Sequence, residues 1–275
     1  MTLPRLGGAS GRPLGYIPNW PDFRDYGLAR QTRIRSATER AMSNGLYMPE
    51  VFDQGQQGAC TAHTLAEDRE YLHIKQLAAL GEIAAPTPGG LYSPAFGYWI
   101  ERQIDLGWTG GPFLPDPGDV GSSGRSSCQA LRKYGCALRS DMPYTDSNFS
   151  TAPTDQQMID ALKWPTGQYH FLTGVQDIKD CIASGYNARF GFAVDEGFEG
   201  IGADGIWYLA GSVQGYHETL AYGYDDGVNG GSFLVRNSWG KDWGKAGDFY
   251  FSYAAAANKN VLSDACIQHL GIWSK

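Results

Sequence analysis

Charge is scarce in this chain of 275 residues: only 19% are charged, with 22 basic and 29 acidic side chains that give a net charge of −7. No run of Lys or Arg occurs, so nucleic-acid binding has no electrostatic support. No stretch approaches the roughly 18 apolar residues that a membrane-spanning helix needs, and the start lacks the apolar segment of a secretory signal. These absences predict a protein without a nucleic-acid partner or a membrane span, in a compartment reached without secretion.

Cysteine is rare as well. The five cysteines are an odd number and none stands in the Cys-x-x-Cys spacing of a zinc site; they are Cys60, Cys128, Cys136, Cys181 and Cys266. Reduced thiols in a cytoplasm-like environment are the simplest interpretation, and we expect no metal and no cofactor. The 37 glycines, about twice the usual share of roughly 7%, predict many turns rather than a bundle of helices.

The pattern of apolar residues changes along the chain. Helical spacing predicts helices from Cys60 to Leu80, from Pro94 to Gly107 and over 123–134, while short alternating segments after Trp164 predict strands at 190–194, 205–209, 218–224, 232–236 and 248–253. Helices followed by strands indicate an α+β protein with separate layers. We therefore expect an extended arm over 1–47, rich in Pro and Gly, a helical lobe over 48–165 and a β-rich lobe over 166–275, with the site in the cleft between the lobes.

One cysteine stands at a position that favours a reactive thiolate. Cys60 follows a glycine-rich segment and opens a predicted helix, where free backbone N–H groups and the helix dipole lower the pKa of a thiol. Taken alone, a small buried cysteine that packs the helix start is the better interpretation. Two later residues favour catalysis, because His217 begins a predicted strand and Asn237 ends the next one, and an amide oxygen can orient an imidazole that activates a thiol.

These residues stand in a pattern that resembles the papain-like (C1) cysteine peptidases. The resemblance rests on the segment DQGQQGACT over 53–61, then His217, then NSWGKDWG over 237–244. The arm YIPNWPDFRD over 16–25 is similar to that of bacterial and viral members without long pro-helices. The resemblance implies a two-lobed fold with a helical lobe and an antiparallel, barrel-like β lobe. It implies that Cys60 is the nucleophile, His217 the general acid and base and Asn237 its orienting partner. Gln54 and the Cys60 backbone N–H would form the oxyanion hole.

The resemblance also suggests where a substrate would bind. Gly121 and Ser122 are the counterparts of a segment that pairs with the substrate backbone, although a plain turn before a helix explains them equally well. Asp264 would lie at the floor of a side-chain pocket and favour a basic residue there. Trp239 would shield the hydrogen bond between the catalytic histidine and asparagine.

Some residues depart from the family pattern or tempt other assignments. Gln57 stands where secreted members carry a half-cystine. Glu218 follows the catalytic histidine and should point away from it, because side chains alternate along a strand. His63 lies one turn beyond Cys60 and is better explained as a structural residue than as a second base. Asp225 and Asp226 are better explained as part of a solvated hairpin than as a cation site.

The sequence thus predicts a cysteine-type endopeptidase that hydrolyses protein or peptide substrates, cytoplasmic or virion-associated, with association with a larger assembly such as a virion as a further expectation. The alternatives are a non-catalytic papain-like component of such an assembly, and a transpeptidase or isopeptidase with the same Cys–His pair. We expect the arm to be a permanent structural strap; the alternative is that it crosses the cleft and blocks it.

Overall fold

The computed structural model describes residues 11–19, 37–82, 90–164 and 167–268. The rest of the expected arm, 1–10 and 20–36, and the side chain of Cys266 lie outside this description. Among the described residues, no helix has the length and apolar character needed to cross a bilayer.

The first half of the chain is helical, as predicted. Its helices are α1 (Cys60–Ala79), α2 (Pro94–Asp105), α3 (Gly124–Tyr134) and α4 (Asp155–Ala161). The start of α2 follows from its sequence, because the Ser93 hydroxyl accepts a hydrogen bond from the Phe96 N–H and Pro94 occupies the first turn. Ser123 caps α3 in the same way through the Ser126 N–H. The predicted helices at 60–80, 94–107 and 123–134 are confirmed within two residues.

The second half forms an antiparallel sheet in the order β4-β9-β5-β6-β7-β8. Its strands are β4 (Tyr169–Leu172), β5 (Ala188–Asp195), β6 (Val213–Asp225), β7 (Ser232–Arg236), β8 (Asp248–Ser252) and β9 (Leu262–Gln268). Helices α5 (Val175–Ala183), α6 (Glu196–Glu199) and α7 (Tyr253–Ala257) accompany it. Strand β2 (Ala41–Ser43), within the segment expected as an arm, pairs with β6 and so adds to the same sheet.

One predicted strand is wrong. Residues 205–209 make only an isolated bridge, between Ile206 and Tyr250. The segment is held by Asp195 instead, whose carboxylate accepts hydrogen bonds from Trp207 Nε1 at 2.8 Å and from the Ala210 N–H at 2.7 Å. Its backbone therefore follows the end of β5 as a loop rather than a neighbouring strand.

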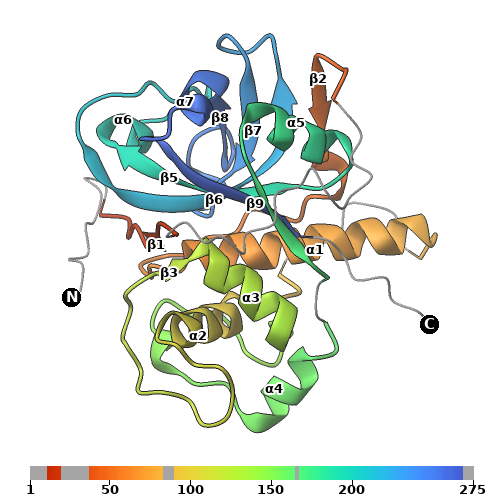
Figure 1. Ribbon diagram of the computed structural model, residues 1–275, viewed down its shortest axis with the longest axis vertical. Coiled ribbons are helices and arrows are strands. Elements are labelled where there is room, and N and C mark those ends of the chain that lie inside the picture. Colours follow the sequence, from red (N-terminus) through yellow and green to blue (C-terminus); the bar gives the residue numbers. More distant parts are fainter. Residues whose placement is uncertain (1–10, 20–36, 83–89, 165–166, 269–275) are drawn as a thin grey trace.

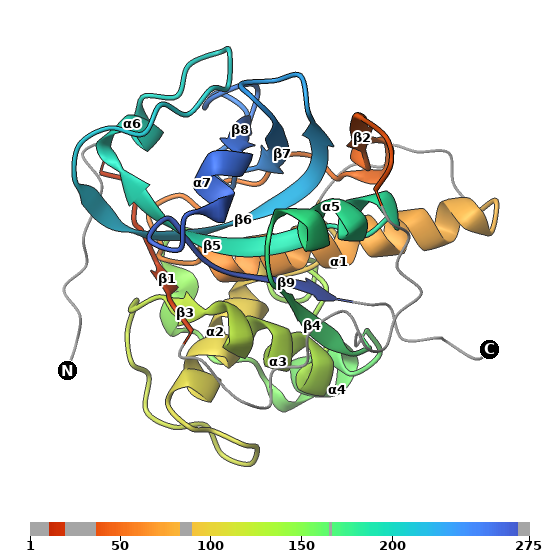
Figure 2. The same cartoon turned by 45° about the horizontal axis from the view of Figure 1, so that its top comes forward.

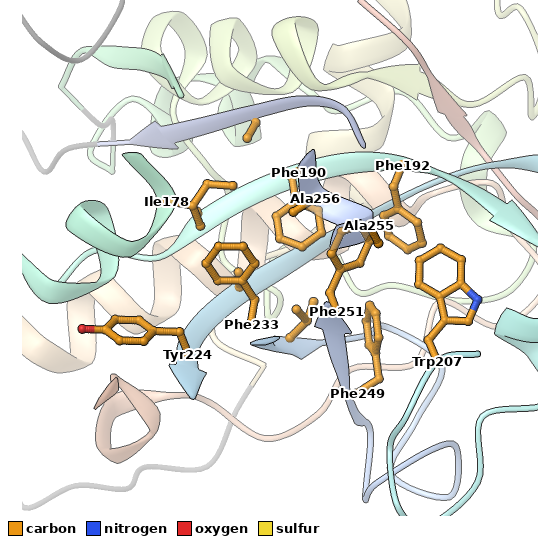
Figure 3. Packing of buried hydrophobic residues seen from close by; sticks show 14 of the residues in the cluster. Ile178, Phe190, Phe192, Trp207, Tyr224, Phe233, Phe249, Phe251, Ala255 and Ala256 are labelled. Carbon is orange, nitrogen blue, oxygen red and sulfur yellow. The ribbon is translucent and has the colours of Figure 1, made fainter. Parts of the chain in front are cut away.

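The sheet closes over an aromatic core. Phe190, Phe192, Phe233, Phe249 and Phe251 are fully buried in one cluster, and α7 contributes the small side chains of Ala255 and Ala256 (Figure 3). The ring centroids of Phe192 and Phe251 are 5.3 Å apart in an edge-to-face arrangement, which aromatic pairs favour. This core fixes the strands that carry the expected histidine and asparagine.

Helix α1 lies between the two halves, with the sheet on one side and α2 and α3 on the other (Figures 1 and 2). Its first residue, Cys60, therefore lies where the lobes meet. The short strand β1 (Tyr16–Ile17) crosses at the same end of α1 and pairs in parallel with β3 (Ser122–Ser123) of the helical lobe. The overall architecture is α+β with two lobes, as predicted.

Candidate active site

A buried imidazole and amide form the centre of the site. His217 Nε2 lies 2.7 Å from Asn237 Oδ1, and both side chains are inaccessible to solvent. An amide oxygen can only accept, so Nε2 carries the proton and donates it. The other ring nitrogen, Nδ1, is then unprotonated in the neutral ring, and it is buried without a hydrogen-bond partner. The histidine is thus held in the tautomer that leaves Nδ1 free to accept a proton.

The aromatic core surrounds this pair. The ring centroid of Trp239 lies 5.0 Å from that of His217, and the Trp239 side chain is only 2% exposed. Burial lowers the pKa of His217 to about 4, although its hydrogen bond to Asn237 acts in the opposite direction. The imidazole is therefore neutral at pH 7 in this conformation.

The Cys60 thiol lies at the N-terminus of α1 and is completely buried. Burial raises its pKa to about 12, while backbone hydrogen bonds from Glu218 and Gly15 lower it. Glu218 is the neighbour of His217 on β6, so the thiol lies beside the strand that carries the imidazole. Gly15 belongs to residues 11–19, which we call the N-terminal segment. This segment consequently reaches the thiol itself.

A buried side-chain amide stands in the chain segment before α1. Gln54 Nε2 donates to the Gln57 carbonyl at 2.9 Å and to the Pro13 carbonyl at 3.4 Å. Its other atom, Oε1, accepts a hydrogen bond from Ser238 Oγ at 2.7 Å, which fixes the amide orientation. A backbone carbonyl of the N-terminal segment thus lies against the amide group expected to bind an oxyanion.

A sequence model of the papain family of cysteine proteases matches residues 118–269, more than half of the chain. This range includes His217 and Asn237 and begins after Cys60.

The chain belongs to the papain family of cysteine proteases.

Individual relatives agree with this assignment. The chain is similar to an uncharacterized peptidase C1-like protein of Acanthamoeba polyphaga mimivirus, with 25% identity over 92% of this chain and 85% of that protein. It is also similar to the crystal structure of xylellain, a cysteine protease from Xylella fastidiosa, with a TM-score of 0.80, 25% identity and coverage of 98% of this chain and 99% of that one. Procathepsin B S9 from Trypanosoma congolense shares the fold at 16% identity, with a TM-score of 0.66 over 93% of this chain and 87% of that one. The protein is therefore a cysteine peptidase with the two-lobed papain-like fold.

The N-terminal segment crosses the cleft of this papain-like fold over the thiol. Besides the contacts of Pro13 and Gly15, the Ser122 N–H donates to the Gly15 carbonyl at 2.8 Å. The approach requires glycine on both sides, because a Cβ on Gly15 would lie 1.9 Å from the Gly58 carbonyl oxygen and one on Gly121 would lie 2.0 Å from the Gly15 carbonyl oxygen. Residues 11–19, a described part of the expected arm, therefore cross the cleft, and the permanent attachment of the arm as a strap stays a prediction.

Tyr16 fills a hollow beside the thiol. Its side chain is buried against Gly191, where a Cβ would lie 2.1 Å from the tyrosine ring, and against Gly124 of α3. Burial raises the pKa of the Tyr16 hydroxyl well above its usual value, and the nearby carboxylates of Asp264 and Glu218 raise it further. The hollow is therefore lined by two glycines, with the carboxyl group of Asp264 beside it.

Polar contacts hold the segment at both ends. On one side of the thiol Arg12 Nη1 lies 2.7 Å from Asp53 Oδ1 in an exposed ion pair. On the other side Asp264 Oδ2 accepts hydrogen bonds from the backbone N–H and the side-chain Nδ2 of Asn19, at 3.3 and 3.0 Å. Asp264 thus lies at the hollow that Tyr16 fills.

The remaining sequence expectations have definite places. Glu218 points away from His217 and pairs with Arg189, as expected from strand alternation. His63 is a buried structural residue, since its Nδ1 lies 2.8 Å from the Ala59 carbonyl oxygen. Asp226 on the hairpin pairs with Lys179 at 2.7 Å. The described cysteines Cys60, Cys128, Cys136 and Cys181 form no disulfide with one another.

Sequence reasoning missed two residues of the site. Ser238, which orients Gln54, directly follows Asn237 in the motif, so its position was a usable signal. Gly15 carries no such signal, because nothing in a segment rich in glycine and proline distinguishes this residue from its neighbours.

Proposed function

We propose that the protein hydrolyses peptide bonds with Cys60 as nucleophile, His217 as general acid and base, Asn237 as its orienting partner and Gln54 as oxyanion donor. The observation that supports this most is the hydrogen bond from His217 Nε2 to Asn237, which leaves Nδ1 as the proton acceptor. Free backbone N–H groups at the start of α1 stabilise a thiolate at the same place.

The chemistry follows from these groups. Nδ1 accepts the thiol proton, and the thiolate sulfur forms a bond to the substrate carbonyl carbon. Gln54 Nε2 and the Cys60 N–H donate to the oxygen that becomes negative. The imidazolium then protonates the leaving amine, and the neutral ring removes a proton from the water that hydrolyses the acyl-enzyme.

This conformation is a latent one. With the N-terminal segment in place the thiol pKa is about 12 and the histidine pKa about 4, so both groups are neutral at pH 7. The chief cause is burial in both cases, and residues 13–16 supply part of that burial over Cys60. Displacement of the segment exposes the thiol to solvent and substrate and removes the obstacle to the thiolate–imidazolium pair.

The substrate binds, in this proposal, where the N-terminal segment lies. Ser122 pairs with an extended backbone, and the hollow of Tyr16, with Asp264 at its edge, receives a side chain. Its acidity favours Arg or Lys over Leu. Because residues 12–19 pass through the cleft without a chain end there, the cleft accommodates an extended polypeptide on both sides of Cys60, which favours endopeptidase activity.

The test is iodoacetamide labelling at pH 6, with the labelled cysteine located by peptide mass mapping. The full chain is compared with its Tyr16→Ala variant, in which the hollow is no longer filled, and with Tyr16→Ala/His217→Ala. We expect Tyr16→Ala to label at Cys60 faster than the unmodified chain, and the rate to fall when His217 is replaced.

The same Tyr16→Ala protein should cleave peptides with Arg at the position that pairs with Ser122 faster than those with Leu. Labelling of Cys60 that does not depend on His217 would contradict the catalytic pair and favour a non-catalytic member of the family. Equal rates for the two peptides would contradict only the proposed preference for a basic side chain at Asp264, and not the catalytic pair.

A further inference from the structure

A buried series of polar side chains starts at the residue that follows His217. Glu218 Oε1 accepts hydrogen bonds from Arg189 Nε at 3.1 Å and from Arg189 Nη2 at 2.8 Å. The same Nη2 donates to Ser127 Oγ at 2.5 Å. Strands β6 and β5 of the sheet are thereby joined to α3 of the helical lobe.

The series ends at the residue that follows Cys60. The Ser127 hydroxyl donates to the Thr61 carbonyl at 3.5 Å, a long contact, and lies close enough to Glu101 to lower the pKa of that carboxyl. The Thr61 hydroxyl donates to Glu101 Oε2 at 2.6 Å. All five side chains of the series are buried, with Arg189 fully inaccessible.

Stability is a poor explanation for this arrangement. Removing a guanidinium and a carboxylate from water costs several kcal/mol per ion, which their attraction barely offsets, and a well-packed apolar pair is often as stable. Arg189 also interacts with a further buried carboxylate, Asp68 of α1, whose pKa it lowers against the effect of burial. One cation thus interacts with groups from both lobes.

Alignment is the better explanation. The nucleophile and the base come from different lobes, on α1 and β6, and a displacement of about 1 Å at such a pair can cost about 100-fold in rate. One further hydrogen bond, from Thr64 Oγ1 to the Glu218 carbonyl at 3.2 Å, ties α1 to β6 directly. The Arg189 series connects the same two elements through Thr61, which follows Cys60 on α1, and Glu218, which follows His217 on β6.

We propose that Arg189, acting through Glu218 and Ser127, is a positioning residue that holds the His217 strand and the Cys60 helix at the separation needed for proton transfer. This role rests on the function proposed above. Arg189 touches no substrate in it; it acts on the geometry of the pair.

The test uses the full chain carrying Tyr16→Ala and compares the rates of Cys60 alkylation by iodoacetamide at pH 6 and pH 9. At pH 9 an ordinary thiol is largely ionised, whereas at pH 6 the reaction depends on the imidazole. The rate at pH 6 divided by the rate at pH 9, called the ratio below, therefore reports the alignment of the pair. The mild variants are Ser127→Ala and Thr61→Val, singly and together. Ser126→Ala is the matched control on the same helix, since its hydroxyl bonds Asp105 outside the series.

We expect each mild variant to lower the ratio about 10-fold relative to Ser126→Ala, and the double variant to lower it no further than the worse single one, because a series acts as a unit. Arg189→Met should lower it most, and Arg189→Lys should restore part of the loss. A lower melting temperature with an unchanged ratio, or additive effects in the double variant, would overturn the positioning role. If the rate of Cys60 labelling in the Tyr16→Ala protein did not change when His217 is replaced by Ala, both the proposed function and the positioning role would be overturned.

Discussion

The two faces of strand β5 differ sharply in chemistry. Phe190, Phe192 and Val194 point to one face, into the aromatic core of the sheet lobe. Arg189 and Gly191 point to the other, toward α1 and α3. On the second face, Gly191 lies opposite Glu218 on β6 and opposite Asp264 on β9. One face of β5 is therefore apolar, and the other carries Arg189 of the buried ion pair and the glycine that lies against Tyr16.

The two faces contribute to the fold in different ways. Burial of aromatic rings gives a large, non-directional contribution to folding, whereas buried charges are costly and fix geometry. His217 lies opposite Phe192 and hence on the apolar face, which keeps it dry. The polar face meets the helix that carries the nucleophile and the segment that covers it.

The largest expected effect is on the apolar face. Phe192→Ala should lower the free energy of unfolding by about 3–5 kcal/mol, because it removes a fully buried ring and leaves a cavity. Urea unfolding followed by tryptophan fluorescence measures it. Tyr208→Ala is the control, since this aromatic residue is 67% exposed and should change the free energy by about 0.5 kcal/mol or less. A loss below about 1 kcal/mol for Phe192→Ala would mean that the apolar face does not carry the stability.

The polar face should make stability depend on pH. Burial raises the pKa values of Asp68 and Glu101 to about 7 and that of Glu218 to about 6. Since the folded form holds these protons more tightly than the unfolded chain, the stabilising contribution is complete below the unfolded pKa values near 4 and is lost as the pH rises to about 7. Each group contributes at most about 1.4 kcal/mol per pH unit.

The measurement is urea unfolding at pH 5, 6, 7 and 8 for the full chain and for Asp68→Asn. The histidines His63 and His217, with pKa values lowered to about 4, act in the opposite direction between pH 4 and 6.5, but they act equally in both proteins. The difference between the two curves therefore isolates Asp68. The substitution should flatten the fall in stability between pH 5 and 7; parallel curves would contradict a buried, neutral carboxyl at this position.

Much of the apolar face and of the site was predictable from sequence. Residues 190–194 alternate in a way that predicts a strand, and Cys60, His217 and Asn237 stand in short motifs whose chemistry is local to each segment. The Ser93 cap and Pro94 likewise mark the start of α2 through neighbouring residues alone. Such features depend on interactions within a few positions of the chain, and sequence patterns report those directly.

The polar face was not predictable, because its partners are distant in the chain. Arg189 pairs with Glu218 and Ser127, 29 and 62 positions away, and no pattern in the sequence connects them. The path of the N-terminal segment is similar, since Tyr16 lies against Asp264, which is distant in the chain. The wrong strand at 205–209 has a related cause, because the Asp195 carboxylate that holds Trp207 and Ala210 lies 12 and 15 positions away in the chain.

The smallest expected effect concerns a second Arg–carboxylate ion pair, Arg12 with Asp53, which lies outside both faces of β5. Arg12 and Asp53 are 28% and 51% exposed, whereas Arg189 and Glu218 are 0% and 2% exposed. An exposed pair is screened by water and salt and contributes about 0.2–1 kcal/mol, so Arg12→Ala should loosen the N-terminal segment only slightly. Iodoacetamide labelling of Cys60 should rise by about 5-fold at most, and salt should produce a similar rise in the unmodified chain. Lys163→Ala, which removes an exposed ion pair in the helical lobe, serves as the control. A rise of 100-fold would show that this exposed contact, rather than Tyr16 in its buried hollow, holds the segment over the thiol.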